Sequence, residues 1–156
     1  MPSPPNQQNV YEAFEIGEHF RILPPEVPLH QDGRIELITA RGAFGSGEHE
    51  TTANCLEELM LLKPEGARVL DFGTGTGILA VAALKLGARR AVGVDIDPRA
   101  IKAARQNAEL NEVDIELHLG DLDMVDETGF DLVLANIYAD VLLGCVDQLL
   151  ARTASG

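Results

Sequence analysis

Short apolar runs alternate with longer segments of helical periodicity over most of the chain. Four runs of four to six residues have the apolar or alternating pattern of buried strands: 69–72, 91–95, 115–119 and 130–135. Three segments carry apolar residues at helical spacing: 78–86, 98–111 and 139–154. Apolar strands separated by helices are typical of parallel strands covered on both faces. The pattern therefore predicts an α/β fold built on a doubly wound, mostly parallel sheet.

A different pattern precedes this alternation. Two apolar-rich runs, 20–23 and 34–38, are separated by a segment with an Asp-Gly turn signal, and they predict two strands joined by a loop. Thr51 and Thr52 then open a predicted helix. The first residues are polar and rich in proline, so we expect them to be disordered. The expected organisation is a disordered lead, a β-rich segment with a glycine turn, and an α/β domain: 1–9, 10–48 and 49–156.

Composition narrows the function classes. The chain has 156 residues, of which 12 are basic and 25 acidic, and a net charge of −13. A surface of that sign repels phosphate groups, so we expect no nucleic-acid partner. No apolar run approaches the roughly 20 residues of a membrane helix, and the polar start is not a secretory signal. We expect a cytoplasmic protein without membrane contact and, because Cys55 and Cys145 lack metal-ligand spacing, no metal site.

The acidic residues are concentrated in the second half of the chain. Between Arg105 and Arg152 there are eleven acidic residues and no lysine or arginine. Such a run is most often a solubilising face. It can also attract a cationic substrate. The sequence leaves both interpretations open.

The strongest local signal is a glycine-rich turn at 71–77. Its motif, Asp-Phe-Gly-Thr-Gly-Thr-Gly, follows a predicted strand and opens a predicted helix. Glycines allow a sharp turn and the close approach of a ligand, and the helix start offers free N–H groups. We therefore expect Gly73, Gly75 and Gly77 to bind a nucleotide-like cofactor. Their G-x-G-x-G spacing departs from the G-x-G-x-x-G of dinucleotide enzymes and disfavours a dehydrogenase.

An acidic residue follows the next predicted strand, at the edge where parallel strands place their ligands. Asp95 lies 22 residues after Gly73 and can accept hydrogen bonds from both hydroxyls of a ribose. That position suits NAD and S-adenosylmethionine equally. Asp97 directly precedes Pro98, and we expect it to cap the following helix instead.

Two further polar residues follow the remaining predicted strands. Asp121 comes after the third strand, where an acid either meets the amine of an adenine or lies in an exposed loop. Asn136 comes after the fourth, where its amide oxygen can accept a hydrogen bond from a substrate amine. The alternative for Asn136 is a cap on the last helix.

Four segments together resemble one known family, the PrmA methyltransferases: 42–52, 71–77, 94–98 and 135–138. These are class I, Rossmann-like enzymes that use S-adenosylmethionine to modify amino groups of a large-subunit ribosomal protein. The resemblance implies S-adenosylmethionine as the cofactor and a ribosomal protein as the partner. It puts Thr52, Gly73, Asp95 and Asn136 at cofactor-contacting positions. It also implies that the loop at 44–52 folds over the cofactor.

The chain departs from the family at both ends. About 40 residues precede the loop at Phe44, which is too few for the substrate-recognition domain that family members carry. The chain ends after the fourth strand of the main sheet, whereas the class I sheet has seven, so we expect the last three strands to be lacking. A sheet edge left open in this way invites self-association.

The expected function is methyl transfer from S-adenosylmethionine to a lysine amino group of a large-subunit ribosomal protein. Asn136 is the expected catalytic residue, orienting the neutral amine while water takes its proton. One alternative keeps this chemistry but acts on another protein or on a small amine. Another is a cofactor-binding module without turnover.

Overall fold

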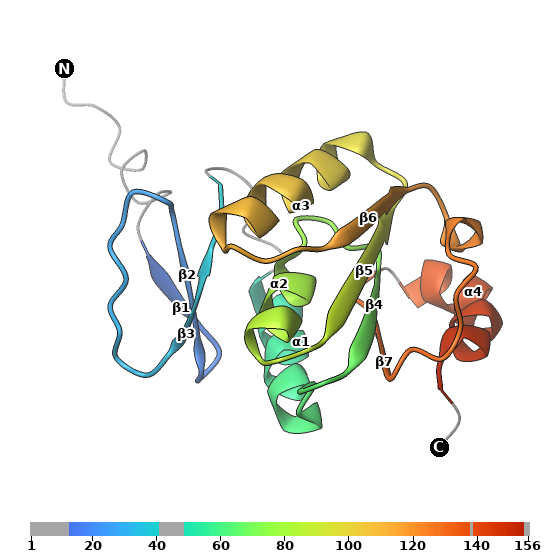
Figure 1. The fold of residues 1–156 in the computed structure, drawn as a ribbon, viewed down its shortest axis with the longest axis horizontal. Coiled ribbons are helices and arrows are strands. Elements are labelled where there is room, and N and C mark those ends of the chain that lie inside the picture. Colours follow the sequence, from blue (N-terminus) through green and yellow to red (C-terminus); the bar gives the residue numbers. More distant parts are fainter. Residues whose placement is uncertain (1–12, 41–48, 138, 155–156) are drawn as a thin grey trace.

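The molecule consists of two β-sheets with a layer of helices between them (Figure 1). The computed structural model describes residues 13–40, 49–137 and 139–154. Within these residues, the main sheet has four parallel strands in the order β6-β5-β4-β7: β4 (Arg68–Phe72), β5 (Arg90–Asp95), β6 (Glu116–Leu119) and β7 (Leu132–Ala135). The smaller sheet has the order β1-β2-β3: β1 (Phe14–Ile16), β2 (Phe20–Leu23) and β3 (Ile35–Ile38).

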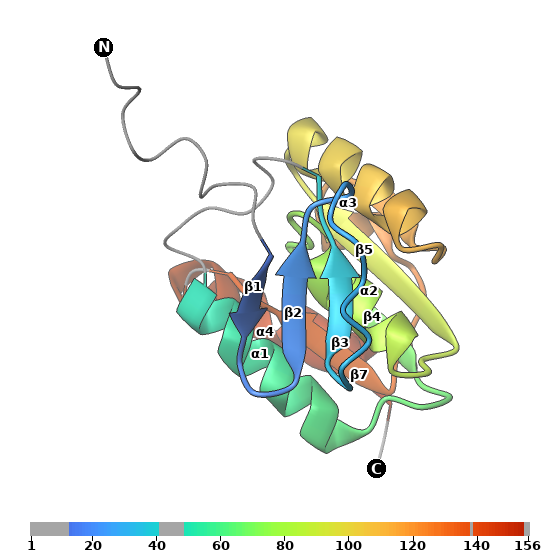
Figure 2. The same cartoon turned by 90° about the vertical axis from the view of Figure 1, so that its left-hand side faces the viewer.

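Helices cover both faces of the main sheet. Between the two sheets lie α1 (His49–Leu62), α2 (Ile78–Lys85) and α3 (Pro98–Leu110). The last helix, α4 (Ala139–Arg152), lies on the opposite face of the main sheet. Seen from the side, the smaller sheet lies in front of α1 and α2 (Figure 2). This arrangement confirms the predicted α/β class, with a doubly wound, Rossmann-like parallel sheet.

The central strands send alternate side chains into two apolar layers, as the twofold period of a strand requires. Val69 and Ala91 are buried in the layer that contains α1 and α2. Their neighbours Leu70 and Val92 are buried on the other side, in a cluster with Leu149 of α4. Burying one aliphatic side chain of this kind stabilises a fold by about 1.5–3 kcal/mol. The two clusters therefore hold helices against both faces.

The smaller sheet shares its core with the rest of the molecule. Phe20, Ile22 and Leu37 are buried in one apolar cluster. The same cluster contains Leu59 of α1 and Val81 of α2. The segments on either side of the expected boundary between residues 48 and 49 therefore contain different sheets but share one hydrophobic core.

Every helix and strand that the sequence predicts within the described residues is present, with ends shifted by at most two residues. Two elements were not predicted: β1 and a short 3₁₀ helix, η2 (Leu122–Met124). Each has three residues, too few for a periodic pattern. The expected disordered lead at 1–9 and the glycine turn at 42–47 lie outside the described residues.

Both edge strands of the main sheet have one neighbour in the part of the chain that the structure describes. At one edge β6 pairs with β5 alone, and at the other edge β7 pairs with β4 alone. After α4 the chain returns to the beginning of this edge, where Thr153 forms an isolated parallel bridge with Phe130. The N–H of Ala154 also donates to the carbonyl of Phe130 at 2.7 Å. The bridge covers the start of the edge and leaves β7 itself without a second neighbour among the described strands.

Candidate functional site

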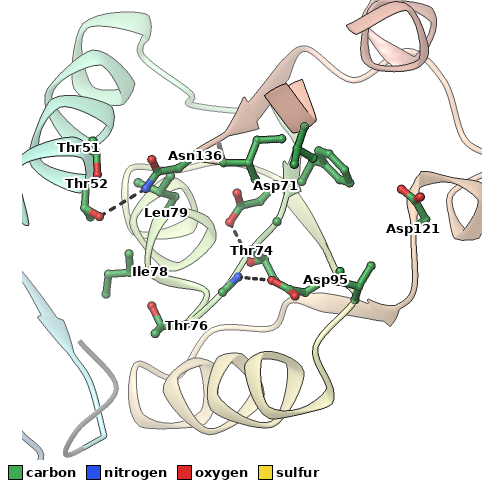
Figure 3. Close-up of a pocket in the computed structure, with 16 residues that line it drawn as sticks. Thr51, Thr52, Asp71, Thr74, Thr76, Ile78, Leu79, Asp95, Asp121 and Asn136 are labelled. Atoms are coloured by element: carbon green, nitrogen blue, oxygen red, sulfur yellow. Dashed lines mark hydrogen bonds between the residues drawn. The ribbon is translucent and has the colours of Figure 1, made fainter. Parts of the chain in front are cut away.

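A cavity opens at the carboxyl ends of β4, β5 and β7, the edge where open α/β sheets place their ligands. Its volume is about 620 Å³, within the range of small-molecule sites. The turn after β4, the ends of β5 and β7, and the start of α1 surround it (Figure 3). Six of the predicted site residues line it: Thr52, Gly73, Gly75, Asp95, Asp121 and Asn136.

The turn from β4 into α2 is fixed to β5 through its backbone. The N–H groups of Gly73 and Thr74 both donate to the carbonyl of Val94, at 2.8 and 3.0 Å. Gly73 has a φ of 71°, and a Cβ at this position would lie 2.3 Å from Cγ2 of Ile137. Glycine is favoured here, because another residue would have to adopt the left-handed backbone region and push the side chain of Ile137 aside.

Gly77 ends the turn and is not among the described residues that line the cavity. It has a φ of 76°, and a Cβ on it would lie 3.0 Å from the Cβ of Ala104 in α3. The third glycine of the motif therefore allows α2 to pack closely on α3. Contact between Gly77 and a cofactor stays a prediction. The close packing against Ala104 is a sufficient reason for a glycine at this position, even without such a contact.

The carboxylate of Asp95 lines the cavity at the end of β5 (Figure 3). Its Oδ2 accepts from the N–H of Gly75 and its Oδ1 from the N–H of Asp97, each at 2.9 Å. These bonds fix the orientation of the carboxylate, and each oxygen keeps a further lone pair for a ligand hydroxyl. The carboxylate of Asp97 accepts from the N–H of Arg99 at 2.9 Å, which confirms its predicted role as the cap of α3.

Asp71 is a buried carboxyl group that the sequence motif contains but does not single out. It is 1% exposed, and its Oδ2 accepts from the hydroxyl of Thr74 at 2.8 Å. The backbone N–H of Ala80, in the first turn of α2, also bonds to it. Burial, with a smaller contribution from the carboxylate of Asp95, raises the pKa of Asp71 to about 7, although the two hydrogen bonds act in the opposite direction. An acid at the end of an apolar strand was the sequence signal for this group.

Asn136 and Thr52 bring the end of β7 and the start of α1 together at the cavity (Figure 3). The side-chain NH₂ of Asn136 donates to the hydroxyl of Thr52 at 3.5 Å, a long hydrogen bond. Thr52 is 3% exposed, so this hydroxyl is held by its surroundings. With its NH₂ group turned to Thr52, Asn136 has its amide oxygen as the acceptor for a ligand.

Asp121 lies on the rim of the cavity and is exposed. Its carboxylate accepts from the N–H of Leu122 at 2.7 Å and so caps η2. The sequence left open whether this acid meets an adenine amine or lies in an exposed loop. In the structure Asp121 is an exposed residue that caps η2, and it also lines the cavity. Tyr138 lies outside the described residues, and the expected loop at 44–52 is described only from residue 49.

The charge of the cavity is one-sided. The described residues that line it include three carboxyl groups, those of Asp71, Asp95 and Asp121, and neither lysine nor arginine. This lining favours a neutral or cationic ligand over one that carries phosphate groups.

The described His, Cys, Asp and Glu residues form no cluster that could hold a metal ion. Among the described helices, none has both the length and the apolar character of a membrane span.

Comparisons with known proteins point to one family. The family model described as "Ribosomal protein L11 methyltransferase (PrmA)" matches residues 5–156. A curated relative named ribosomal protein L11 methyltransferase, from Symbiobacterium thermophilum, is 43% identical over 148 residues, which are 94% of this chain and 49% of the relative. The chain thus spans about half the length of the curated relatives it matches.

Solved structures agree with this match. The chain is similar to a ribosomal protein L11 methylase from Lactobacillus delbrueckii subsp. bulgaricus, with a TM-score of 0.82 and 33% identity over 92% of this chain and 75% of that one. It is also similar to an RNA methyltransferase from Salinibacter ruber, solved in complex with S-adenosylhomocysteine. That match has a TM-score of 0.59 and 25% identity, and it covers 66% of this chain and 70% of the other.

The buried carboxyl of Asp71 predicts a particular pH dependence of stability. Because its pKa rises from 3.8 to about 7 on folding, the folded protein holds a proton there that the unfolded chain releases. This contribution to stability is complete at low pH and is lost as the pH rises toward 7. Asp71→Asn is neutral at every pH, so wild type should lose stability relative to Asp71→Asn as the pH rises from about 4 to about 7, and the difference should level off above that. Thermal unfolding of both proteins across this range measures the difference.

Asp97→Asn is the matched control for this experiment. Hydrogen bonds from Arg99 lower the pKa of Asp97 below its ordinary value, so this carboxylate stays ionised across the same range. The difference in stability between wild type and Asp97→Asn should therefore not change with pH. Parallel curves for wild type and Asp71→Asn would show that Asp71 does not carry the proton.

Proposed function

Because the chain belongs to the PrmA family of ribosomal protein L11 methyltransferases, we propose that it is an S-adenosylmethionine-dependent N-methyltransferase. Its proposed substrate is a lysine amino group of a large-subunit ribosomal protein. L11, the protein named in the relatives' descriptions, is the first substrate to test. A substrate of this kind implies a cytoplasmic location.

The observation that carries the proposal is the match between the cavity and the parts of S-adenosylmethionine. Asp95 offers lone pairs on both carboxylate oxygens to the ribose hydroxyls. Beside it, Ile96 lines the cavity with a side chain that is 76% exposed and gives an adenine ring an apolar surface. Asp121 also lines the cavity, and in the proposed complex it accepts a hydrogen bond from the adenine amine. At Gly75, an added Cβ would have its nearest neighbour, the carbonyl oxygen of Gly73, 3.9 Å away, so glycine leaves this space to a ligand.

The same cavity is poorly suited to a dinucleotide. A pyrophosphate binds at the N-terminus of a helix, through free N–H groups. At α2, the N–H of Ala80 is already bonded to the buried carboxyl of Asp71. The other carboxyl groups of the lining, without a described lysine or arginine among them, also oppose a pyrophosphate. The charges therefore favour cationic S-adenosylmethionine over NAD, a choice that the position of Asp95 in the sequence left open.

The proposed chemistry asks little of the protein beyond positioning. S-adenosylmethionine supplies a methyl group that its cationic sulfur has already activated. A lysine side chain has an ordinary pKa of about 10.4, so it must release a proton before its nitrogen can react. In the proposed mechanism the amide oxygen of Asn136 accepts a hydrogen bond from the neutral amine and directs its lone pair, and water takes the released proton. Thr52 holds the Asn136 amide in place through its hydroxyl.

The acidic surface supports a lysine-containing substrate. Near the cavity, Asp121, Asp123 and Asp126 are exposed around η2. Asp140 is exposed in the first turn of α4, beside Val141, which lines the cavity. Carboxylates around an opening attract a cationic segment and raise its local concentration. Of the two interpretations that the sequence left open, we therefore propose the second for this part of the surface.

Two further proposals concern the extent of the chain. The chain spans about half the length of its curated relatives. We therefore propose, as a separate point, that this chain by itself catalyses methyl transfer. A cofactor-binding module without turnover is the second candidate, and the edge of β7 that lacks a described neighbour favours it. We also propose that two copies associate through this edge, because unpaired backbone groups of a strand bind a second strand.

The role of Asp95 is tested by calorimetric titration with S-adenosylhomocysteine, a stable analogue of the cofactor. Asp95→Ala should weaken binding at least about 100-fold, because two hydrogen bonds to a charged group contribute about 1.5–3 kcal/mol each. Asp95→Asn keeps an acceptor for the N–H of Gly75 and should lose less affinity. Asp97→Asn is the control and should bind as wild type does. A folded wild-type chain that binds no S-adenosylhomocysteine would refute the proposed function, whereas wild-type affinity in Asp95→Ala would refute only the role of this carboxylate.

Asn136 should affect the reaction more than cofactor binding. In Asn136→Ala, the rate of radiolabelled methyl transfer from S-adenosylmethionine to L11 should fall about 100-fold, because the acceptor amine is no longer oriented. The affinity for S-adenosylhomocysteine should change much less. Thr52→Val removes the hydroxyl that holds the amide and should give an intermediate rate. Full activity in Asn136→Ala would show that another group orients the amine, and a wild-type chain that binds cofactor without transferring methyl groups would favour the second candidate.

Self-association should appear in sedimentation velocity as a rise of the sedimentation coefficient with protein concentration. The expected end point is a dimer, because one strand edge pairs with one other edge. A coefficient that stays at the value of a monomer over the whole concentration range would exclude association through β7.

A further inference from the structure

Two buried asparagines at the C-terminal end of α3 face the edge of the smaller sheet. Asn107 lies in the helix, and Asn111 is its C-cap, whose N–H still bonds to the carbonyl of Asn107, so the two lie on the same side of α3. Asn107 is 0% exposed and Asn111 is 7% exposed. A buried amide that lacked partners would destabilise the fold, and both of these are hydrogen-bonded. Their partners differ, and the difference is informative.

Asn111 acts on the smaller sheet. Its Oδ1 accepts from the N–H of Ile38 at 2.8 Å, and its Nδ2 donates to the carbonyl of the same residue at 2.6 Å. This pair reproduces the contacts that a neighbouring strand would make with β3. The Nδ2 of Asn111 also donates to the carbonyl of Asn107 at 2.7 Å, within α3. No bond recorded for Asn111 in the described part of the chain reaches the cavity.

Asn107 connects two segments that are distant in the sequence. Its Oδ1 accepts from the N–H of Ala40, two residues after β3, at 2.8 Å. Its Nδ2 donates to the carbonyl of Thr76 at 2.9 Å. Thr76 belongs to the glycine turn and lines the cavity. One fully buried amide therefore joins the end of the smaller sheet to the cavity wall.

We propose that Asn107 is a positioning residue for the cofactor cavity, coupling the smaller sheet to the glycine turn through the carbonyl of Thr76. The proposal rests on the proposed function, in which the cavity binds S-adenosylmethionine.

The path from Asn107 to the ligand is short. Thr76 is adjacent to Gly75, whose N–H donates to Oδ2 of Asp95 at 2.9 Å. The carbonyl of Thr76 and the N–H of Gly75 are separated only by the φ and ψ angles of these two residues, because the peptide unit between them is planar. Anchoring both groups therefore restricts this short stretch of the turn. Without Asn107, the carbonyl of Thr76 loses this donor, and the turn can relax away from Asp95. The carboxylate that accepts the ribose hydroxyls would then lose the bond that orients it.

Asn107→Ala and Asn111→Ala form a matched pair of variants for the test. Both remove a buried amide from the same face of α3 and a bond to the same segment of the chain. Their thermal stabilities and far-UV circular dichroism are measured first, and then their affinities for S-adenosylhomocysteine by calorimetry. Asn107→Ala should bind about tenfold more weakly than wild type, as expected for the loss of a buried hydrogen bond. Asn111→Ala should bind with unchanged affinity, even if it is equally destabilised.

Asn107→Asp separates the two bonds of this residue and serves if the alanine variant does not fold. A neutral carboxylic acid can accept from Ala40 and donate to the carbonyl of Thr76, as the amide does, whereas an ionised carboxylate has no proton to donate. The affinity of Asn107→Asp relative to wild type should therefore recover as the pH falls from about 8 to about 5. A role confined to stability predicts no such recovery.

A second readout uses no variant. Coupling is reciprocal, so a ligand that depends on the Asn107 link should in turn stabilise it. Addition of S-adenosylhomocysteine to wild type should slow hydrogen exchange of the amide of Ala40. The amide of Ile38, held by Asn111, should change less.

The outcomes separate this inference from the proposed function. A folded wild type that binds no S-adenosylhomocysteine would overturn both. Wild-type binding together with equal affinities in the two alanine variants, or with no change in exchange at Ala40, would overturn the role of Asn107 alone.

Discussion

The cavity depends on the turn between β4 and α2 keeping a single backbone path. Hydrogen bonds to two other elements fix this path: to the carbonyl of Val94 and the carboxylate of Asp95 in β5, and to the side chain of Asn107 in α3. The contact with Ile137 after β7 restricts it further, because a side chain at Gly73 would collide with Ile137. The five residues between β4 and α2 are therefore held by β5, by α3 and by the segment that follows β7. Without these contacts the glycines would make the turn flexible, since glycine restricts the backbone least.

The same turn places a proton in the interior of the protein. Asp71 is the next-to-last residue of a central strand, and burial raises its pKa to about 7 although Thr74 and Ala80 donate to it. Near neutral pH this carboxyl is therefore divided between its charged and neutral forms. The arrival of a cationic ligand in the cavity favours the charged form, because opposite charges attract more strongly away from bulk water. In the proposed complex, part of the negative charge near the ligand would therefore come from Asp71 and part from Asp95.

The sequence predicts the parts of this site that obey local rules. Asp95 and Asn136 follow predicted strands, and the carboxyl ends of parallel strands meet at one edge, so their convergence could be predicted. Asp97 could be recognised as a cap because it precedes a proline at the start of a helix. The role of Gly77 was less accessible, since its contact with Ala104 depends on the packing of two helices.

Long-range hydrogen bonds could not be predicted at all. Asn107 bonds to residues 67 and 31 positions away, and nothing in the local pattern of α3 distinguishes it from an exposed helical asparagine. The strand β1 escaped prediction for another reason, because its three residues depend on β2 for their conformation. Functional residues at strand ends can thus be predicted from a single sequence, whereas the residues that hold them in place can be identified only from the structure.

The amide of Asn111 has a consequence for how the protein behaves when it is concentrated. The edge of a sheet is a template for aggregation, and proteins commonly protect it with lysine, proline or a bulge. Here an asparagine side chain from a helix occupies both backbone groups of Ile38, on the strand that ends the smaller sheet. The other end of that sheet, β1, has only three residues to offer. The backbone groups of Ile38 are therefore not available to pair with a strand of another molecule.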